Sequence, residues 1–186
     1  MKRKLELHEI AGYLPYGLGI KCNITKAHTL FGYYKTFYQQ WEEWAVVNDP
    51  DEENQTSNVL FDDIAPILRP LSDLYKPITH NGEEIVPIVE LAKRAFNFNV
   101  NDWNMVIDAN SNFYRSVYFV REKTIQKEII YFWYDKAGYF AINNSVFHTS
   151  QYGLFDYLHE LKVDFRGLID AGLAIDCNTL ENNPYK

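Results

Sequence analysis

The stretch KEIIYFWYDKAGYFAIN, residues 127–143, decides the fold expected from this sequence. Its first part, 127–134, is rich in the β-branched and aromatic side chains that strands favour. The turn sequence Asp135-Lys136-Ala137-Gly138 follows, and a second short apolar run occupies 138–143. Residues 114–121, just upstream, are likewise rich in aromatic and β-branched side chains. Three such runs with short connections predict an antiparallel meander.

Helical patterns lie on both sides of this meander. Residues 90–96 favour a helix, and residues 151–162 place apolar side chains at helical spacing. Asp164 is expected to cap a second short helix that runs through Asp170, with Gly172 in a left-handed conformation beyond it. The apolar face of the 151–162 helix consists of Leu154, Phe155, Leu158 and Leu161. The sequence therefore predicts an α+β fold: a twisted antiparallel β-sheet with several short helices packed on it and a C-terminal helical pair.

The N-terminal half contains shorter signals. Leu18, Ile20, Cys22 and Ile24 alternate as on one face of a strand. Further strands are expected over 30–36, 38–47 and 173–176, a short helix over Ile64–Leu68 capped by Asp62 or Asp63, and a single helical turn over 72–75. Asn81-Gly82 predicts a hairpin that pairs residues 75–79 with 85–89.

Length and charge limit the classes of protein. A chain of 186 residues suits a single domain spanning 1–186, and 12 Phe, 14 Tyr and 4 Trp provide an unusually aromatic core. The net charge of -7 argues against general nucleic-acid binding, which needs clustered Lys and Arg. The longest acidic stretch, 42–63, contains no Lys or Arg and is expected to be largely solvated.

The two cysteines and the hydropathy pattern limit which covalent or metal sites and which cellular location are expected. Cys22 and Cys177 cannot form a disulfide framework or a four-ligand zinc site, so buried free thiols are expected. No apolar run is long enough for a membrane span, and the basic N-terminus lacks the apolar core of a signal peptide. We expect a soluble cytoplasmic protein with no membrane partner, no metal site and no cofactor.

Three segments carry a resemblance to other proteins: LPYGL at 14–18, APILRPLSDL at 65–74 and GLIDAGLAID at 167–176. Their order and wording resemble a group of small proteins found mainly in prophages and other mobile elements of gut Bacteroidetes. The resemblance covers roughly residues 5–22, 60–90 and 150–180. It implies a mobile-element protein built on apolar anchors and turns, and no activity is established for the group.

Candidate catalytic groups must be assembled from scattered residues, because the sequence lacks phosphate-loop, dinucleotide, hydrolase-elbow and zincin motifs. Asp156, His159 and Glu160 have a helical spacing suited to a metal-assisted hydrolase or nuclease, and equally to a polar helix face. His80 with Glu83 and Glu84 lies on the predicted hairpin turn. A third set of acids, Asp164, Asp170 and Asp176, suits metal binding or, more simply, capping and turn roles. We expect the structural interpretation in each case.

An aromatic cluster remains as the candidate binding site. Tyr34, Tyr38, Trp41 and Trp44, together with Tyr33 and Phe37, suit either core packing or a surface for a protein or ligand, and the sequence leaves both open. Because anchors and turns dominate and catalytic motifs are absent, we expect a non-enzymatic accessory or regulatory protein that binds an unidentified protein partner. The alternatives are the metal-assisted hydrolase above and a small-molecule binder with an aromatic pocket.

Overall fold

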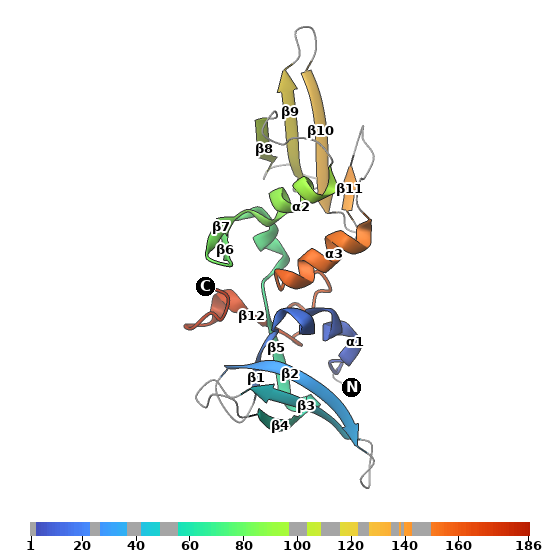
Figure 1. Cartoon of the computed structure of the whole chain (residues 1–186), viewed down its shortest axis with the longest axis vertical. Helices are drawn as coiled ribbons and strands as arrows, with labels where there is room; N and C mark the ends of the chain where they lie inside the picture. Colours follow the sequence, from blue (N-terminus) through green and yellow to red (C-terminus); the bar gives the residue numbers. More distant parts are fainter. Residues whose placement is uncertain are drawn as a thin grey trace. The chain divides into compact units, whose positions relative to one another are not determined.

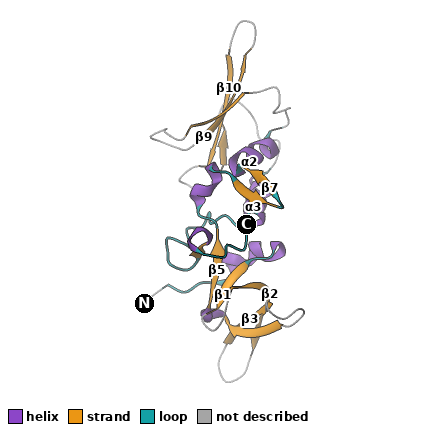
Figure 2. Cartoon of the chain, turned by 90° about the vertical axis from the view of Figure 1, so that its left-hand side faces the viewer, coloured by secondary structure: helices purple, strands orange, loops and turns teal. Residues whose placement is uncertain are grey.

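The computed structural model describes residues 3–22, 27–36, 42–48, 56–96, 104–108, 116–122, 127–134, 138, 140–142 and 150–186 (Figure 1). The chain divides into two compact units, which are described separately. Unit 1 contains residues 1–71 and 159–185, and unit 2 contains residues 72–158 and Lys186. Helices and strands occur in both units (Figure 2), which confirms the α+β class. The single-domain prediction for 1–186 stays a prediction.

Unit 1 is built on a six-stranded sheet with the order β12-β5-β1-β2-β3-β4. Neighbouring strands are antiparallel, except that β12 runs parallel to β5. The elements of unit 1 are α1 (Leu7–Ile10), η1 (Ala11–Tyr16), β1 (Gly19–Cys22), β2 (Ala27–Thr36), β3 (Glu42–Asn48), β4 (Thr56–Leu60), η2 (Phe61–Asp63), β5 (Ile64–Leu68), β12 (Ile175–Asp176) and η5 (Cys177–Thr179).

The sheet of unit 1 is curled. Strands β4 and β5 are four strand spacings apart in the hydrogen-bonded order, which is about 19 Å in a flat sheet. Only the 3₁₀ turn η2 joins them, and the chain from Leu60 to Ile64 spans at most about 14 Å. The sheet must therefore bend, and β2 is visibly curved in Figure 1. Its concave face holds a core that includes Ile10, Tyr13, Leu18, Ile20, Cys22, Phe61, Ile64, Leu68 and Leu168.

Several N-terminal expectations are confirmed. Ile20 and Cys22 of β1 are buried, as is Leu18 just before the strand, while Ile24 lies outside the described residues. The expected strand over 30–36 lies within β2. The expected short helix over Ile64–Leu68 is wrong, because these residues form β5 between β1 and β12. A short apolar run has no periodicity that separates helix from strand, and pairing on both edges favours the strand here.

The prediction of a second helix in the C-terminal helical pair is also wrong. Residues 164–172 form successive turns, because the Asp164 carboxylate binds the N–H groups of Leu168 and Ile169. Gly167 and Gly172 have φ values of 73° and 68°, a left-handed conformation that interrupts a helix. The predicted left-handed Gly172 and the strand within 173–176 are confirmed as β12 and its preceding turn.

Unit 2 contains the predicted meander with one additional edge strand. Its four-stranded sheet has the order β11-β10-β9-β8, and all pairs are antiparallel. Helix α3 begins in this unit, and its last two residues belong to unit 1. The elements are η3 (Leu71–Tyr75), β6 (Ile78–His80), β7 (Glu83–Ile85), α2 (Pro87–Ala95), β8 (Asn104–Asp108), β9 (Ser116–Glu122), β10 (Lys127–Tyr134), β11 (Phe140–Ile142) and α3 (Gln151–Glu160).

The predicted hairpin exists but is shorter than expected. Asn81 and Gly82 both have positive φ, 51° and 81°, as a tight primed turn requires. The returning strand ends at Ile85 because Pro87 begins helix α2. The expected pairing through Val89 is therefore wrong, since proline at the first helical position is preorganised for a helix.

Aromatic rings form the centre of unit 2. Phe132 of β10 is fully buried, stacked on Phe140 at 5.4 Å between ring centroids and edge-on to Phe96 at 5.8 Å. The side chain of Gln151 donates to the carbonyl of Phe140 (2.7 Å) and accepts from its N–H (3.0 Å), which ties the start of α3 to the edge strand β11. Arg94 of α2 lies over the ring of Tyr157 of α3 at 3.8 Å. One face of the meander is thus packed.

Candidate functional site

The second face of the meander exposes apolar side chains. Along β10, Ile130 and Phe132 are buried, whereas Tyr131 between them is 36% exposed. The register places Val106, Tyr118 and Tyr131 in one row across three strands, and Val106 is 40% exposed. We call this surface the outer face; its positions with described side chains are Asn104, Val106, Val120, Ile129, Tyr131, Trp133 and Ala141.

None of these seven positions is charged, and the register continues the face to Asp108, Glu122 and Lys127 at the strand ends. Four strands about 4.8 Å apart, with side chains about 6.7 Å apart along each strand, give it an area on the order of 300 Å². Within this area Val106 and Tyr131 are exposed and the other apolar positions are half-buried, and apolar side chains gathered on a water-exposed sheet often mark an interaction site. Tyrosine and tryptophan suit such a surface because each offers a large apolar ring with a polar group at its rim.

The sequence itself contains a signal for the outer face. An antiparallel strand with one wet face alternates apolar and polar residues, but 129–134 reads Ile-Ile-Tyr-Phe-Trp-Tyr, apolar on both faces. This composition is typical of a strand covered on both sides. Among the described residues, Phe96 and Phe140 cover the side of the strand that holds Phe132, whereas Tyr131 on the other side is exposed.

The aromatic residues predicted as a binding site fall partly within the described chain. Tyr34 of β2 lies directly opposite Trp44 of β3, and Trp44 lies opposite Leu60 of β4. Leu60 is 39% exposed. The structure thus brings Tyr34 and Trp44 into one cross-strand row, while Tyr38 and Trp41 lie outside the described residues. Whether the cluster binds a partner stays a prediction.

Unit 1 contains a cavity of about 370 Å³ beside the N-terminal segment. Arg3, Lys4, Phe61, Asp62 and Gly172 are among its lining residues. Lys4 forms an ion pair with Asp62, and Arg3 forms one with the buried Glu9. Because both cations have carboxylate partners, the cavity offers no unpaired positive charge to an anionic ligand.

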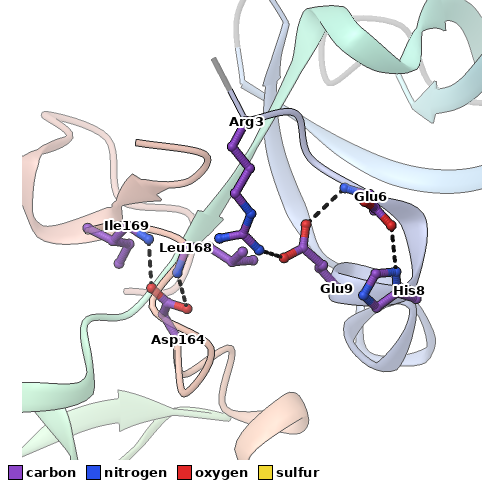
Figure 3. A network of polar contacts seen from close by, with 7 residues as sticks. All are labelled: Arg3, Glu6, His8, Glu9, Asp164, Leu168 and Ile169. Carbon is purple, nitrogen blue, oxygen red and sulfur yellow. Dashed lines mark hydrogen bonds and ion pairs between the residues drawn. The ribbon is translucent and has the colours of Figure 1, made fainter. Parts of the chain in front are cut away.

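The Arg3 ion pair belongs to a network at the N-terminus of α1. Glu9 accepts from Arg3 and from the N–H of Glu6 (2.9 Å), and Nδ1 of His8 lies 3.2 Å from the Glu6 carboxylate. Figure 3 shows these groups gathered around the start of α1. Together they form a capping box, so the carboxylates have a local structural role.

The alternative catalytic residues do not form a metal site. Within the described ranges, no group of three or more His, Cys, Asp or Glu side chains is arranged to hold a metal ion. His159 lies edge-on to Tyr13, with 4.7 Å between ring centroids, and 5.0 Å from Phe165. The imidazole is packed among aromatic rings, apart from any carboxylate cluster of this kind. A catalytic role for Asp156, His159 and Glu160 stays a prediction that receives no support from this arrangement.

The other acidic and histidine groupings have structural roles where the structure describes their bonds. Asp164 accepts from Leu168 and Ile169, and Asp176 accepts from the N–H of Asn178 (2.8 Å). The turn assignment of Asp176 is therefore confirmed, whereas the expected helix cap at Asp164 is wrong, because the residues that its carboxylate binds form turns. His80 and Glu83 are paired across the β6–β7 hairpin, beside the exposed turn. Cys22 and Cys177 are buried free thiols, as expected, and burial raises the pKa of Cys22.

Alanine at Gly12 is expected to destabilise unit 1 by about 1–3 kcal/mol, because overpacking a filled core displaces its neighbours. A Cβ at Gly12 would lie 2.4 Å from the His159 imidazole. That ring is confined by Tyr13 and Phe165, so it cannot move away cheaply. Urea denaturation should show that the Gly12→Ala and His159→Ala effects are not additive, with the double variant less destabilised than the sum. Additive effects would contradict this packing.

Comparison with protein families, with curated proteins and with solved structures found no match to this chain. The described part of the chain contains no helix that is both long and apolar enough to cross a membrane. The function must therefore be argued from the geometry itself.

Proposed function

We propose that this chain is a non-enzymatic accessory protein that acts by binding another protein through the outer face of the β8–β11 sheet. One observation carries the proposal: residues 129–134 of β10 are apolar on both faces, yet Tyr131 is 36% exposed on the outer face whereas Ile130 and Phe132 are buried on the other. Water against Val106, Tyr131 and Trp133 is displaced when an apolar partner surface covers them, and that displacement provides the binding free energy.

The shape and charge of the outer face favour a protein partner. Small molecules bind in concave sites that enclose most of their surface, whereas a sheet face is an extended platform. Nucleic acids need clustered cations, whereas the register places a single lysine, Lys127, on the outer face, opposite Glu122. About 300 Å² is smaller than the roughly 800 Å² that each partner contributes to a standard interface, so the outer face is proposed as the apolar centre of a larger contact.

The resemblance to proteins of prophages and mobile elements suggests where the partner of this chain is encoded. We propose that the partner is encoded by the host or by the element itself, and that its contact surface is apolar and uncharged. Binding to a second copy of this chain is the competing outcome, and the experiment below distinguishes the two.

A photoreactive phenylalanine analogue at position 131 is expected to crosslink the partner in living host cells. The same analogue at Tyr152, which is 79% exposed on α3, provides the matched control. We expect one crosslinked protein at position 131 that is absent at position 152 and is lost when Val106 is replaced by lysine. With the identified partner purified, Tyr131→Ala should weaken binding about tenfold or more, as for an aromatic residue at the centre of an interface. Tyr152→Ala should change the affinity less than about twofold.

Three results would contradict the proposal. Equal crosslinking from positions 131 and 152 would show that the contact is non-specific. A product made only of two copies of this chain would assign the outer face to self-association. An unchanged affinity after Tyr131→Ala, with the fold intact, would exclude the outer face as the binding site.

A further inference from the structure

Tyr185 occupies a site formed by β1, β5 and the residues that follow these strands. Its hydroxyl donates to the carbonyl of Ile67 (2.7 Å) and accepts from the N–H of Gly19 (3.0 Å). Its own carbonyl accepts from Nη2 of the buried Arg69 (2.7 Å). The Arg69 guanidinium lies 5.4 Å from the ring centroid, and the Lys162 ammonium 5.8 Å. We call Gly19, Ile67, Arg69 and Lys162 the tyrosine site.

The tyrosine site requires a glycine at position 19. A Cβ on Gly19 would lie 3.0 Å from the Tyr185 hydroxyl and 3.3 Å from Cγ of Pro184. Both contacts are closer than side chains normally tolerate, so the Pro-Tyr pair approaches the β1 backbone directly. The site therefore contacts the ring, the hydroxyl and the carbonyl of a tyrosine, together with the proline before it.

The hydroxyl of Tyr185 stands where a sheet hydrogen bond would otherwise form. Ile20 pairs with Pro66 and Lys21 with Ala65, so Gly19 and Ile67 are the next pair in the same antiparallel register. In the structure their N–H and C=O groups bind the hydroxyl placed between them. If Tyr185 leaves, these two groups can bind each other or water. Departure of Tyr185 therefore leaves neither backbone group without a hydrogen-bond partner.

Burial of the segment in the site also includes unfavourable contributions to the free energy. Nδ2 of Asn183 is buried without a hydrogen-bond partner among the described residues. Desolvation lowers the pKa of Lys162, with a further lowering from Arg69 opposed by Glu160. Burial likewise raises the pKa of Tyr185 above its ordinary value. Release of the segment would hydrate the buried amide nitrogen of Asn183, which favours an exchangeable contact over a permanent one.

We propose that the tyrosine site is a peptide-binding site for a Pro-Tyr sequence, filled within the chain by Asn183–Tyr185 and open to a Pro-Tyr segment of another protein when those residues leave. This site is separate from the outer face, and neither proposal depends on the other. The intramolecular segment acts as a competitor, because its attachment gives it a high effective concentration at the site.

The test uses the full chain with Tyr185→Ala, which removes the ring and the hydroxyl from the site, and a fluorescent peptide of sequence ENNPYK, residues 181–186. Fluorescence anisotropy should show that this variant binds the peptide at least about tenfold more tightly than the wild-type chain does, because the internal competitor has lost its ring and hydroxyl contacts. A peptide with alanine in place of tyrosine should not bind. Gly19→Val in the same background should abolish binding, since its side chain fills the space of the hydroxyl. Tyr152→Ala, which leaves Tyr185 in place, should bind no more tightly than wild type.

The proposal is overturned if the folded Tyr185→Ala chain does not bind the peptide, or if it binds the alanine peptide equally well. Binding that survives Gly19→Val would also overturn it. Should Tyr185→Ala fail to fold, the wild-type chain provides the test by nuclear magnetic resonance. A large excess of the tyrosine peptide, but not of the alanine peptide, should then shift the amide signals of Gly19 and of Tyr185 itself, and no shift overturns the proposal.

Discussion

Replacing Phe132 by alanine is expected to lower the free energy of unfolding of unit 2 by about 3–5 kcal/mol, the usual cost of truncating a buried aromatic side chain. Phe132 has no exposed surface and contacts Phe140 and Phe96 ring to ring. Deleting its ring leaves a cavity that the stacked neighbours fill only in part, and the paired-ring interactions are also lost. Urea denaturation followed by circular dichroism measures the change.

Tyr131→Ala is the matched control, one residue away on the same strand. Because Tyr131 is partly exposed on the outer face, its truncation should cost about 1 kcal/mol or less. Similar losses at the two positions would mean that β10 is buried on both faces. That result would remove the basis for a partner-binding surface.

Replacing Asp164 by alanine is expected to destabilise unit 1 by about 2–4 kcal/mol, because two hydrogen bonds to a buried carboxylate are lost. Asp164 is 4% exposed and accepts from the N–H of Leu168 (2.9 Å) and of Ile169 (2.7 Å), as Figure 3 shows. Alanine leaves both donors without this acceptor, and Leu168 is part of the core. Thermal denaturation should show a lower melting temperature.

Asp170→Ala provides the control for Asp164, since Asp170 is exposed and lies in the same series of turns. Its replacement should change the stability by less than about 0.5 kcal/mol, as for most surface positions. Asp164→Asn should fall between the two, because an amide retains one acceptor oxygen. An Asp164→Ala chain as stable as the Asp170→Ala chain would show that the turns do not depend on the carboxylate.

Local patterns were enough to predict most elements. The meander runs at 114–121, 127–134 and 138–143 correspond to β9, β10 and β11, and 151–162 contains α3. These predictions succeeded because strand composition, turn residues and helical spacing act over a few neighbouring residues. The strand β8 was not predicted. Its five residues begin with Asn104 and end with Asp108, and both residue types are uncommon in strands. Pairing with β9 stabilises the extended conformation that the local sequence does not favour.

The candidate sites depended much less on sequence pattern. Tyr34 and Trp44 were selected from an aromatic cluster, and their position opposite each other in the β2–β3 ladder follows only from the register. The lack of apolar–polar alternation in 129–134 indicates that both faces of β10 are apolar, but it does not indicate which face is exposed. Tyr185 carried no signal, because its contacts with Gly19 and Ile67 join residues more than a hundred positions apart.

By itself, the sequence determined the α+β class, the antiparallel meander, the buried cysteines and the turns at Gly82 and Gly172, since these follow from composition and backbone preference. Only the tertiary structure decided that Ile64–Leu68 is a strand and that residues 164–172 are turns. It alone revealed the outer face and the tyrosine site. Pairing partners, burial and close backbone approach are properties of distant segments brought together, and no local pattern specifies them.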